Sequence, residues 1–297
     1  MPVIQVSDRV GVVPGGVNIG VVRVDDSRCL LIDTGLNETN AKKALKAVRG
    51  DLGSEVVGIL TTHAHADHFG GNATVVKRTG ARVWAPDFDE AILRYPILQP
   101  ICLFAGADPL DSLRNNFLLA DPSPVDKVIK PGKLSIEGVA IDVVSLAGHS
   151  PNQVGYMVEG VFFCADVVLP ETVLAKYKIP YLHSVTTHLA ALETAAKAEC
   201  AFAIPGHGLI LDSLSPLIDV NRKLIDEVMN QILECTREPM DASHVLTAVL
   251  MHFEAPVKDA SSFYLLHPTI YAFLSHLERQ GAIWHEMIDS RSLWRSA

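Results

Sequence analysis

The stretch Thr61-Thr62-His63-Ala64-His65-Ala66-Asp67-His68 places three imidazoles and one carboxylate within six positions of the chain. The apolar run 56–60 before it predicts a buried strand. The stretch 68–78 after it, closed by Gly80, predicts a helix. Because imidazole and carboxylate groups both bind zinc, the stretch predicts a metal site at the end of a strand, a hypothesis that its structural setting must test.

The spacing within this stretch indicates more than one cation. Alternate residues of an extended segment point the same way, so we expect His63 and His65 to approach one cation from the same side. Asp67 and His68 are adjacent and must diverge, which suggests a second cation beside the first. Two cations need further ligands from elsewhere in the chain.

Three more polar residues stand at the ends of apolar, strand-like runs. They are His149 in Gly148-His149-Ser150, Asp166 after the run 161–165, and His207 in Pro205-Gly206-His207-Gly208. A single histidine after a strand is more often an ordinary surface or core residue than a ligand. The repetition of the pattern therefore carries the prediction that these residues join one site on loops.

In this order, the segments resemble those of the metallo-β-lactamase superfamily, and within it the glyoxalase II-like hydrolases. The resemblance covers roughly residues 10–211 and includes Leu31-Ile32-Asp33-Thr34-Gly35. It implies an αββα sandwich with the metals at one edge.

The resemblance also implies seven metal ligands in two sets, with His63, His65 and His149 on one metal, Asp67, His68 and His207 on the other, and Asp166 bridging both. It implies two zinc ions, with iron or manganese as alternatives, and a hydroxide between them that attacks the substrate. Asp67 is expected to act also as a catalytic group that orients this water or carries a proton. Asp33 is expected to orient a metal-bound imidazole from behind, although Asp-Thr-Gly is also a common turn sequence.

The relatives of the superfamily narrow the activity. Asp166 argues against β-lactamase activity, because the true β-lactamases lack the bridging aspartate, and diiron electron-transfer relatives carry a glutamate where His65 stands. The sequence therefore predicts a binuclear hydrolase acting on a small carbonyl ester, a thioester or a lactone. Persulfide dioxygenases, which share the histidine-rich run and bind one iron, are the non-hydrolytic alternative. A non-catalytic sensor that keeps the metals is a weaker one.

Composition points to a cytoplasmic enzyme. The 297 residues are 48% hydrophobic and carry a formal net charge of −9, and no apolar run approaches the roughly eighteen residues of a membrane span. The first residues lack the pattern of an export signal. The five cysteines are odd in number and far apart, which suits a reducing compartment. We expect a small-molecule substrate and no membrane partner.

We expect two domains, a catalytic domain over 1–212 and a smaller one over 213–297. Within the first, Ala41, Ala44, Leu45 and Val48 predict a helix over 39–49 that ends at Gly50. The segment 86–131, called the insertion below, holds five prolines between 96 and 124 and cannot form one long helix. It forms either a lid or substrate wall, or a helical pair packed on the sandwich. Such a lid or wall can be shared with a second subunit, so a homodimer stays open as a partner.

Tyr177, Tyr181 and His183 follow Asp166 where superfamily members often present a residue to the substrate. Each is a candidate proton donor or substrate contact, although Tyr-Leu in a loop is more often packing. Lys176 and Lys178 are candidates to attract an anion, or are simply solvated.

The part after about residue 212 resembles a winged helix. Two apolar stripes and a third predicted helix, starting at Pro268 and ending before Gly281, precede a short strand over 282–288. From Ile218 onward there are seven Lys and Arg against eleven Asp and Glu. Nucleic-acid affinity depends on Lys and Arg neutralising phosphates, so nucleic acid is not expected as a partner. An RNA phosphodiesterase of the same fold remains the alternative hydrolase.

Overall fold

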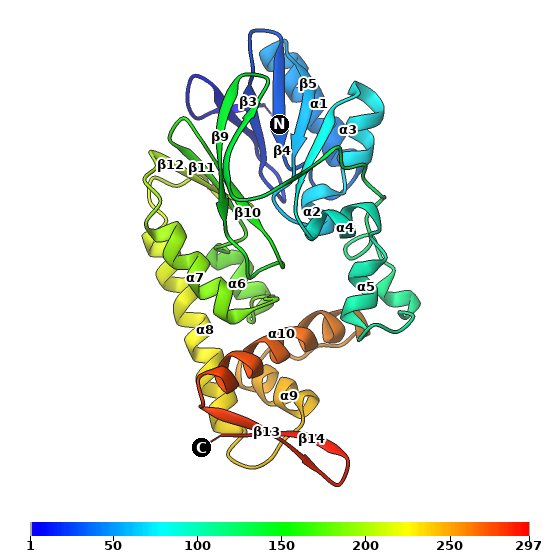
Figure 1. Cartoon of the computed structure of the whole chain (residues 1–297), viewed down its shortest axis with the longest axis vertical. Helices are drawn as coiled ribbons and strands as arrows, with labels where there is room; N and C mark the ends of the chain where they lie inside the picture. The colour runs from blue at the N-terminus through cyan, green and yellow to red at the C-terminus, as the bar shows by residue number, and fades with distance from the viewer. Residues whose placement is uncertain (1, 297) are drawn as a thin grey trace.

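The computed structural model describes residues 2–296. Two sheets pack face to face at one end of the molecule, and a largely helical region lies at the other end (Figure 1). The first sheet has seven strands in chain order: β1 (Ile4–Gln5), β2 (Val10–Val13), β3 (Ile19–Arg23), β4 (Arg28–Ile32), β5 (Glu55–Leu60), β6 (Arg82–Pro86) and β7 (Lys127–Ile129). Pairing is antiparallel from β1 to β4 and parallel from β4 to β7.

The second sheet has five strands in the order β12-β11-β10-β9-β8. They are β8 (Gly132–Ile136), β9 (Val139–Ser145), β10 (Val154–Val158), β11 (Val161–Ala165) and β12 (Phe202–Pro205). Leu60 and Trp84 of the first sheet meet Ile141, Tyr156 and Phe163 of the second in one buried apolar layer. The Tyr156 hydroxyl donates to the carbonyl oxygen of Thr61 at 2.6 Å, which fixes the start of the histidine-rich loop.

Helices cover the outer face of each sheet. α1 (Glu38–Leu52) and α3 (Asn72–Thr79) pack on the first sheet, while α7 (Val185–Ala196) packs on the second. The resulting four layers confirm the predicted αββα sandwich. The short helices α2 (Ala66–Phe69) and α6 (Glu171–Tyr177) lie at the edge where the sheets open toward the helical region (Figure 1).

Two predicted helix boundaries in the first half are wrong. The expected single helix over 68–78 is two helices, α2 and α3, separated by Gly70 and Gly71. A Cβ on Gly70 would lie 2.0 Å from the carbonyl oxygen of Leu36, so the chain bends here to pass close over that turn. α1 continues through Gly50 to Leu52 and ends at Gly53, whose φ of 63° suits glycine.

The insertion forms short elements, as its prolines predict. They are α4 (Asp89–Arg94), α5 (Leu98–Leu103) and the 3₁₀ helix η1 (Asp111–Leu113), after which the chain joins the first sheet as β7. Leu103, Leu113 and Leu118 form a small apolar cluster with Tyr264 and Leu265 of the C-terminal region. The insertion therefore bridges the sandwich and that region.

The C-terminal region consists of α8 (Ser215–Cys235), α9 (Ala242–His252), α10 (Ala260–Arg279) and the hairpin β13 (Ile283–Ile288) and β14 (Arg291–Ser296). The helical character is as predicted, while the winged-helix resemblance stays a prediction. The expected start of the third helix at Pro268 is wrong. α10 begins at Ala260, where the Asp259 side chain accepts from the Ser262 amide at 2.9 Å, and Pro268 lies inside the helix.

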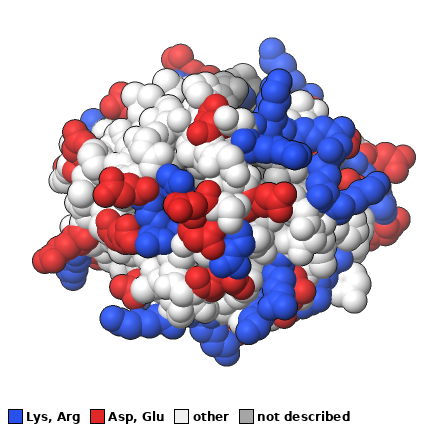
Figure 2. Space-filling model, turned by 90° about the horizontal axis from the view of Figure 1, so that it is seen from above, with Lys and Arg blue, Asp and Glu red and all other residues white. Residues whose placement is uncertain are grey.

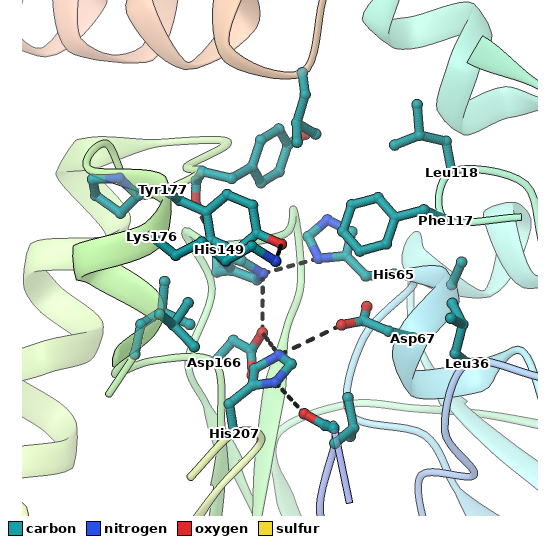
Figure 3. A pocket seen from close by; sticks show the side chains of 18 of the residues that line it. Leu36, His65, Asp67, Phe117, Leu118, His149, Asp166, Lys176, Tyr177 and His207 are labelled. Atoms are coloured by element: carbon teal, nitrogen blue, oxygen red, sulfur yellow. Dashed lines mark hydrogen bonds and ion pairs between the residues drawn. The ribbon is translucent and has the colours of Figure 1, made fainter. Parts of the chain in front are cut away.

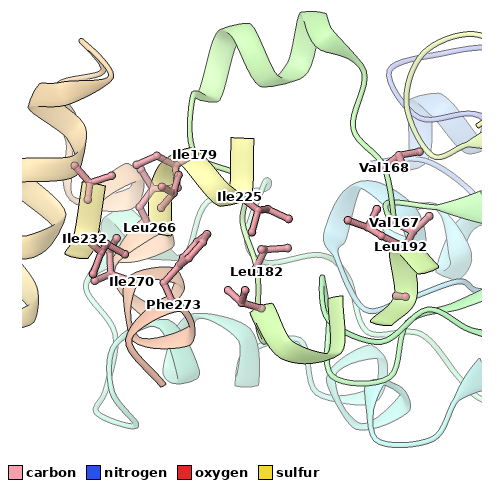
Figure 4. Packing of buried hydrophobic residues seen from close by; sticks show 14 of the residues in the cluster. Val167, Val168, Ile179, Leu182, Leu192, Ile225, Ile232, Leu266, Ile270 and Phe273 are labelled. Atoms are coloured by element: carbon pink, nitrogen blue, oxygen red, sulfur yellow. The ribbon is translucent and has the colours of Figure 1, made fainter. Parts of the chain in front are cut away.

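The C-terminal helices share one apolar core with the second sheet. Val167 and Leu192 near the sheet belong to the same buried cluster as Ile225 of α8 and Phe273 of α10 (Figure 4). Asn221 of α8 adds a polar link, because its side chain accepts from the Leu169 amide at 3.0 Å and donates to the Leu169 carbonyl at 2.9 Å. The predicted boundary near 212 is thus crossed by continuous packing, and the two-domain division stays a prediction. Among residues 2–296 no helix has the length and apolar character that a membrane crossing requires.

Candidate metal centre

The structure brings all seven predicted ligands to one edge of the sandwich. The loop after β5 and the helix α2 carry His63, His65, Asp67 and His68, while His149, Asp166 and His207 follow β9, β11 and β12. They form three overlapping groups of side chains: His63, His65 and His149; His63, His68 and Asp166; and Asp67, His68 and His207. Four strand ends therefore converge on one place.

The first group consists of three imidazoles with their ring nitrogens turned inward. His65 Nδ1 lies 3.0 Å from His63 Nε2. It also lies 2.9 Å from His149 Nε2 (Figure 3). Burial, together with the neighbouring histidines, lowers the pKa of His149 to about 3 and that of His65 to about 4, and it holds the pKa of His63 well below its usual value. The rings are therefore neutral near pH 7, and a cation between them would be bound by His63 Nε2, His149 Nε2 and, in the tautomer protonated on Nε2, His65 Nδ1.

The group of Asp67, His68 and His207 is acidic. His207 Nε2 lies 3.5 Å from Asp67 Oδ2, and the His207 Nδ1–H donates to the carbonyl oxygen of Gly16 at 2.6 Å. Burial opposes charge on this ring, but Asp166 and Asp67 outweigh burial and raise the pKa of His207 to about 10. The nearby carboxylates likewise raise the pKa of His68 well above its usual value, against the effect of burial. Protons therefore neutralise this group when no metal does.

Asp166 lies between the group of His63, His65 and His149 and the group of Asp67, His68 and His207. Its Oδ2 is 3.5 Å from His149 Nε2, 3.4 Å from His68 Nε2 and 3.3 Å from His207 Nε2. Within the described residues, His68 Nε2 and Asp166 Oδ1 are buried without a hydrogen-bond partner. A buried polar atom without a hydrogen-bond partner destabilises the folded chain. These two atoms therefore indicate that a group from outside the chain, such as a metal ion, binds here. The donor set fits divalent cations, because imidazole and carboxylate ligands converge in a buried place.

Asp33 forms hydrogen bonds with residues of the histidine-rich stretch 61–68. One carboxylate oxygen accepts from the Thr62 amide at 2.8 Å, and the other accepts from His68 Nδ1 at 2.7 Å and from the Thr62 hydroxyl at 2.8 Å. Because that hydroxyl donates to Asp33, its oxygen is left to accept from His63 Nδ1, 3.0 Å away. Both rings thereby keep their Nε2 lone pairs for the site. The Asp33 carboxylate thus lies behind His68 and, through Thr62, behind His63, and its orienting role stays a prediction.

Two residues that hold the loops together were missed. Asp89 is buried and accepts from the Ala64 amide at 3.0 Å, the Ser150 hydroxyl at 2.7 Å and the Asn152 amide at 2.8 Å, so it joins the loop of His63 to the loop of His149. The pattern that pointed to Asp166, an acid directly after an apolar run, would have selected Asp87 after the run 83–86 and not Asp89.

Asn18 does the same for the loop of His207. Its side-chain amide donates to the carbonyl oxygens of Pro205 at 2.9 Å and Gly208 at 3.0 Å. Between them, Gly206 must be glycine, because a Cβ there would lie 2.0 Å from Asp166 Oδ1. The signal for Asn18 was a lone amide at the start of an apolar strand, which is too common to single it out.

The three candidate substrate residues have different surroundings. Tyr177 and Tyr181 line a cavity of about 460 Å³ beside the ligands. Tyr181 also accepts from His149 Nδ1 through its backbone carbonyl, at 3.0 Å, and burial raises the pKa of its phenol to about 12. His183 is exposed and does not belong to the lining of this cavity.

The sequence and the fold were compared with those of known proteins. Residues 12–207 match the sequence model of the Metallo-beta-lactamase superfamily. The chain belongs to this superfamily. Metallo-β-lactamase-fold proteins also dominate the structural comparison: a beta-lactamase domain protein from Burkholderia ambifaria has a TM-score of 0.78 at 18% identity and covers 100% of this chain and 95% of that one. A metallo-beta-lactamase family protein from Thermus thermophilus has a TM-score of 0.73 at 19% identity and covers 97% of this chain and 98% of that one. At such identities, the likeness shows the fold alone.

Three curated relatives match only part of this chain. A hydroxyacylglutathione hydrolase from Albidiferax ferrireducens is 29% identical over 143 residues, which are 48% of this chain and 40% of that protein. One from Vibrio campbellii is 27% identical over 150 residues, 50% of this chain and 46% of that protein. A probable metallo-hydrolase from Bacillus subtilis is 25% identical over 198 residues, 66% of this chain and 84% of that protein. The matched region thus covers less than half of the length of each of these two hydroxyacylglutathione hydrolases.

Asp33→Asn tests the orienting role of the carboxylate. An amide oxygen cannot hold Thr62 and His68 together as a carboxylate does, so the affinity for zinc should fall about 10- to 100-fold. Competition with a chromophoric chelator measures this affinity. Asp25→Asn, in an exposed turn, is the matched control and should bind zinc as the unaltered chain does. An unchanged affinity in Asp33→Asn would show that the carboxylate does not orient the ligands.

The two groups should respond differently to pH. His68 and His207 hold protons at neutral pH, since their pKa values are raised, that of His207 to about 10, and a cation must displace those protons. Cation binding at the acidic group should therefore strengthen as pH rises toward about 10 and weaken as pH falls. Binding at the three neutral imidazoles, with pKa values of about 4 or lower, should change little between about pH 6 and pH 9.

Calorimetric zinc titrations in buffers of different ionisation enthalpy measure this difference. One equivalent should bind with little proton release at pH 7, and the other should release protons. Equal proton release for both equivalents would contradict the assignment.

Proposed function

We propose that this superfamily member is a binuclear metallohydrolase that cleaves small carbonyl esters, thioesters or lactones. The observation that carries the proposal is the position of Asp166, whose Oδ2 lies 3.5 Å or less from ring nitrogens of both ligand groups. The names of the two matched hydroxyacylglutathione hydrolases support an acyl thioester as the substrate type. His63, His65 and His149 would hold one cation, Asp67, His68 and His207 the other, and Asp166 both.

A pair of divalent cations, zinc in this proposal with iron or manganese as alternatives, supplies Lewis acidity and an acidified water when bound. The chain's own groups supply the rest. Burial alone would raise the pKa of Asp67, but His68 and His207 lower it to about 2. Asp67 is therefore an ionised carboxylate in the lining of the cavity, suited to orient a water molecule or to carry its proton toward the leaving group.

Of the two candidate donors that line the cavity, Tyr181 packs its ring against His65 and His149. Tyr177 is the one whose hydroxyl is paired with an ammonium. Its hydroxyl oxygen accepts from Lys176 Nζ at 3.0 Å, which leaves its own proton free to donate to a substrate oxygen. Both side chains line the cavity beside the ligands (Figure 3). A phenol assisted by a neighbouring ammonium is suited to stabilise negative charge that develops on the carbonyl oxygen.

The alternatives explain less of the site. A persulfide dioxygenase with one iron needs two histidines and an aspartate, which leaves the other converging ligands without a purpose. An RNA phosphodiesterase needs cations along its groove. Within the described residues Lys176 is the only lysine or arginine that lines the cavity, and basic clusters alternate with acidic ones on the face drawn in Figure 2. We also propose a cytoplasmic location, from five unpaired cysteines, and leave a homodimer as a candidate assembly.

A substrate panel tests the proposed function. The zinc-loaded chain should hydrolyse a thioester or a lactone, lose this activity on chelation and regain it with zinc. In the same assay, Tyr177→Phe should lower kcat about a hundredfold, whereas Tyr271→Phe, exposed on α10 and outside the cavity, should not. Turnover of phosphodiesters alone, or oxygen consumption with one iron per chain, would contradict the proposal.

A further inference from the structure

The cavity beside the metal ligands has the size of a small-molecule site. Its volume of about 460 Å³ lies within the range of about 300 to 1,000 Å³ that is usual for ligand pockets. At one end, the lining includes His65, Asp67 and His207, and away from these residues it becomes apolar (Figure 3). A substrate with its carbonyl at the ligands must therefore place another part of itself against an apolar wall.

Separate parts of the chain build this wall. It includes Leu36 before α1, Phe117 and Leu118 of the insertion, Val173 of α6, and Leu265 and Leu266 of α10. The C-terminal region thus contributes directly to the cavity. Neither the metal ligands nor the proposed hydrolysis accounts for these residues.

The contact between the insertion and α10 holds the wall in place. Ser261 of α10 donates through its hydroxyl to the carbonyl oxygen of Ser112 at 2.7 Å, and Asn115 Nδ2 donates to the Ser261 hydroxyl at 3.3 Å. The rings of Phe104 and Tyr264 pack edge to face, with their centroids 4.8 Å apart. Because these contacts join the two segments and Leu118 packs in the same apolar cluster as Leu265, the apolar wall exists before a ligand arrives, which lowers the entropic cost of binding.

The charges of the lining limit the kind of substrate. Lys176 is the only basic residue in the described lining other than histidines, and its ammonium already donates to the Tyr177 hydroxyl and lies 4.6 Å from the centre of that ring. A substrate portion with several carboxylates would be desolvated here without enough partners. An uncharged apolar chain has no such cost.

We infer that the cavity selects esters that carry an apolar chain next to the scissile bond, and that the insertion and α10 together read the length of this chain. The inference rests on the proposed hydrolase function for the position of the carbonyl. Each methylene that enters the cavity should improve kcat/KM about fourfold until the cavity is filled. The chain belongs either to the acyl group or to the leaving group.

Two substrate series distinguish these two positions. One series joins N-acetylcysteamine to linear acyl groups from acetyl to decanoyl, and the other joins acetyl to linear thiols of increasing length. With the full-length zinc-loaded chain, kcat/KM should rise about fourfold per methylene in one series and stop rising at a limiting length. The series that shows the rise assigns the apolar chain to one side of the ester. Equal rates throughout both series would overturn the inference.

Variants in the wall test which residues read the length. Phe117→Ala should reduce the ratio of long-chain to acetyl kcat/KM, and Leu265→Trp should shift the limiting length to shorter chains. Leu110→Ala is the matched control, because Leu110 lies in the insertion outside the cavity and is 43% exposed, close to the 47% of Phe117. A Phe117→Ala ratio equal to that of Leu110→Ala would contradict the assignment.

Calorimetry separates this inference from the proposed function. Linear carboxylic acids of increasing length should bind the zinc-loaded chain with a Kd that falls about fourfold per methylene. If the acids show this trend and no thioester is hydrolysed, the proposed function fails and the apolar cavity stands. If thioesters are hydrolysed at rates independent of length and the acids show no trend, the inference fails and the proposed function stands.

Discussion

Buried imidazole nitrogens and carboxylates that converge on one place at the ends of the strands constrain the rest of this structure. His65 Nδ1 lies about 3 Å from the inward nitrogens of both His63 and His149, and Asp166 reaches from His149 toward His68 and His207. Neutral lone pairs repel at this distance, and buried carboxylates are costly without partners. Divalent cations relieve both costs, so metal binding and stability are linked in this chain.

The scaffold enforces this arrangement through backbone contacts and buried hydrogen bonds. Gly70 lets the helix carrying His68 pass over the turn after Asp33, and Gly206 leaves room for the Asp166 carboxylate. Asp33, Asp89 and Asn18 then tie the loops to one another. These contacts keep the ligands in place through links between distant segments, and this rigidity distinguishes a metal site from a chance cluster of histidines.

The sequence singled out the seven candidate ligands because each follows an apolar, strand-like run, and their assignment to two metals came from the family resemblance. It also predicted the four layers through the family resemblance. It misplaced the helix around Gly70 and the start of α10, because close backbone approach and an N-cap at Asp259 decide those boundaries. It did not find Asn18 or Asp89, whose partners lie far along the chain. A substrate wall in the insertion was one of the two alternatives predicted, but the contribution of α10 to it could not be predicted for the same reason.

Anomalous diffraction from crystals of the zinc-loaded chain, measured on both sides of the zinc absorption edge, tests the central claim most directly. The account predicts two zinc peaks, one enclosed by His63, His65 and His149 and the other by Asp67, His68 and His207, with the Asp166 carboxylate in contact with both. One peak alone, or peaks outside these side chains, would contradict it.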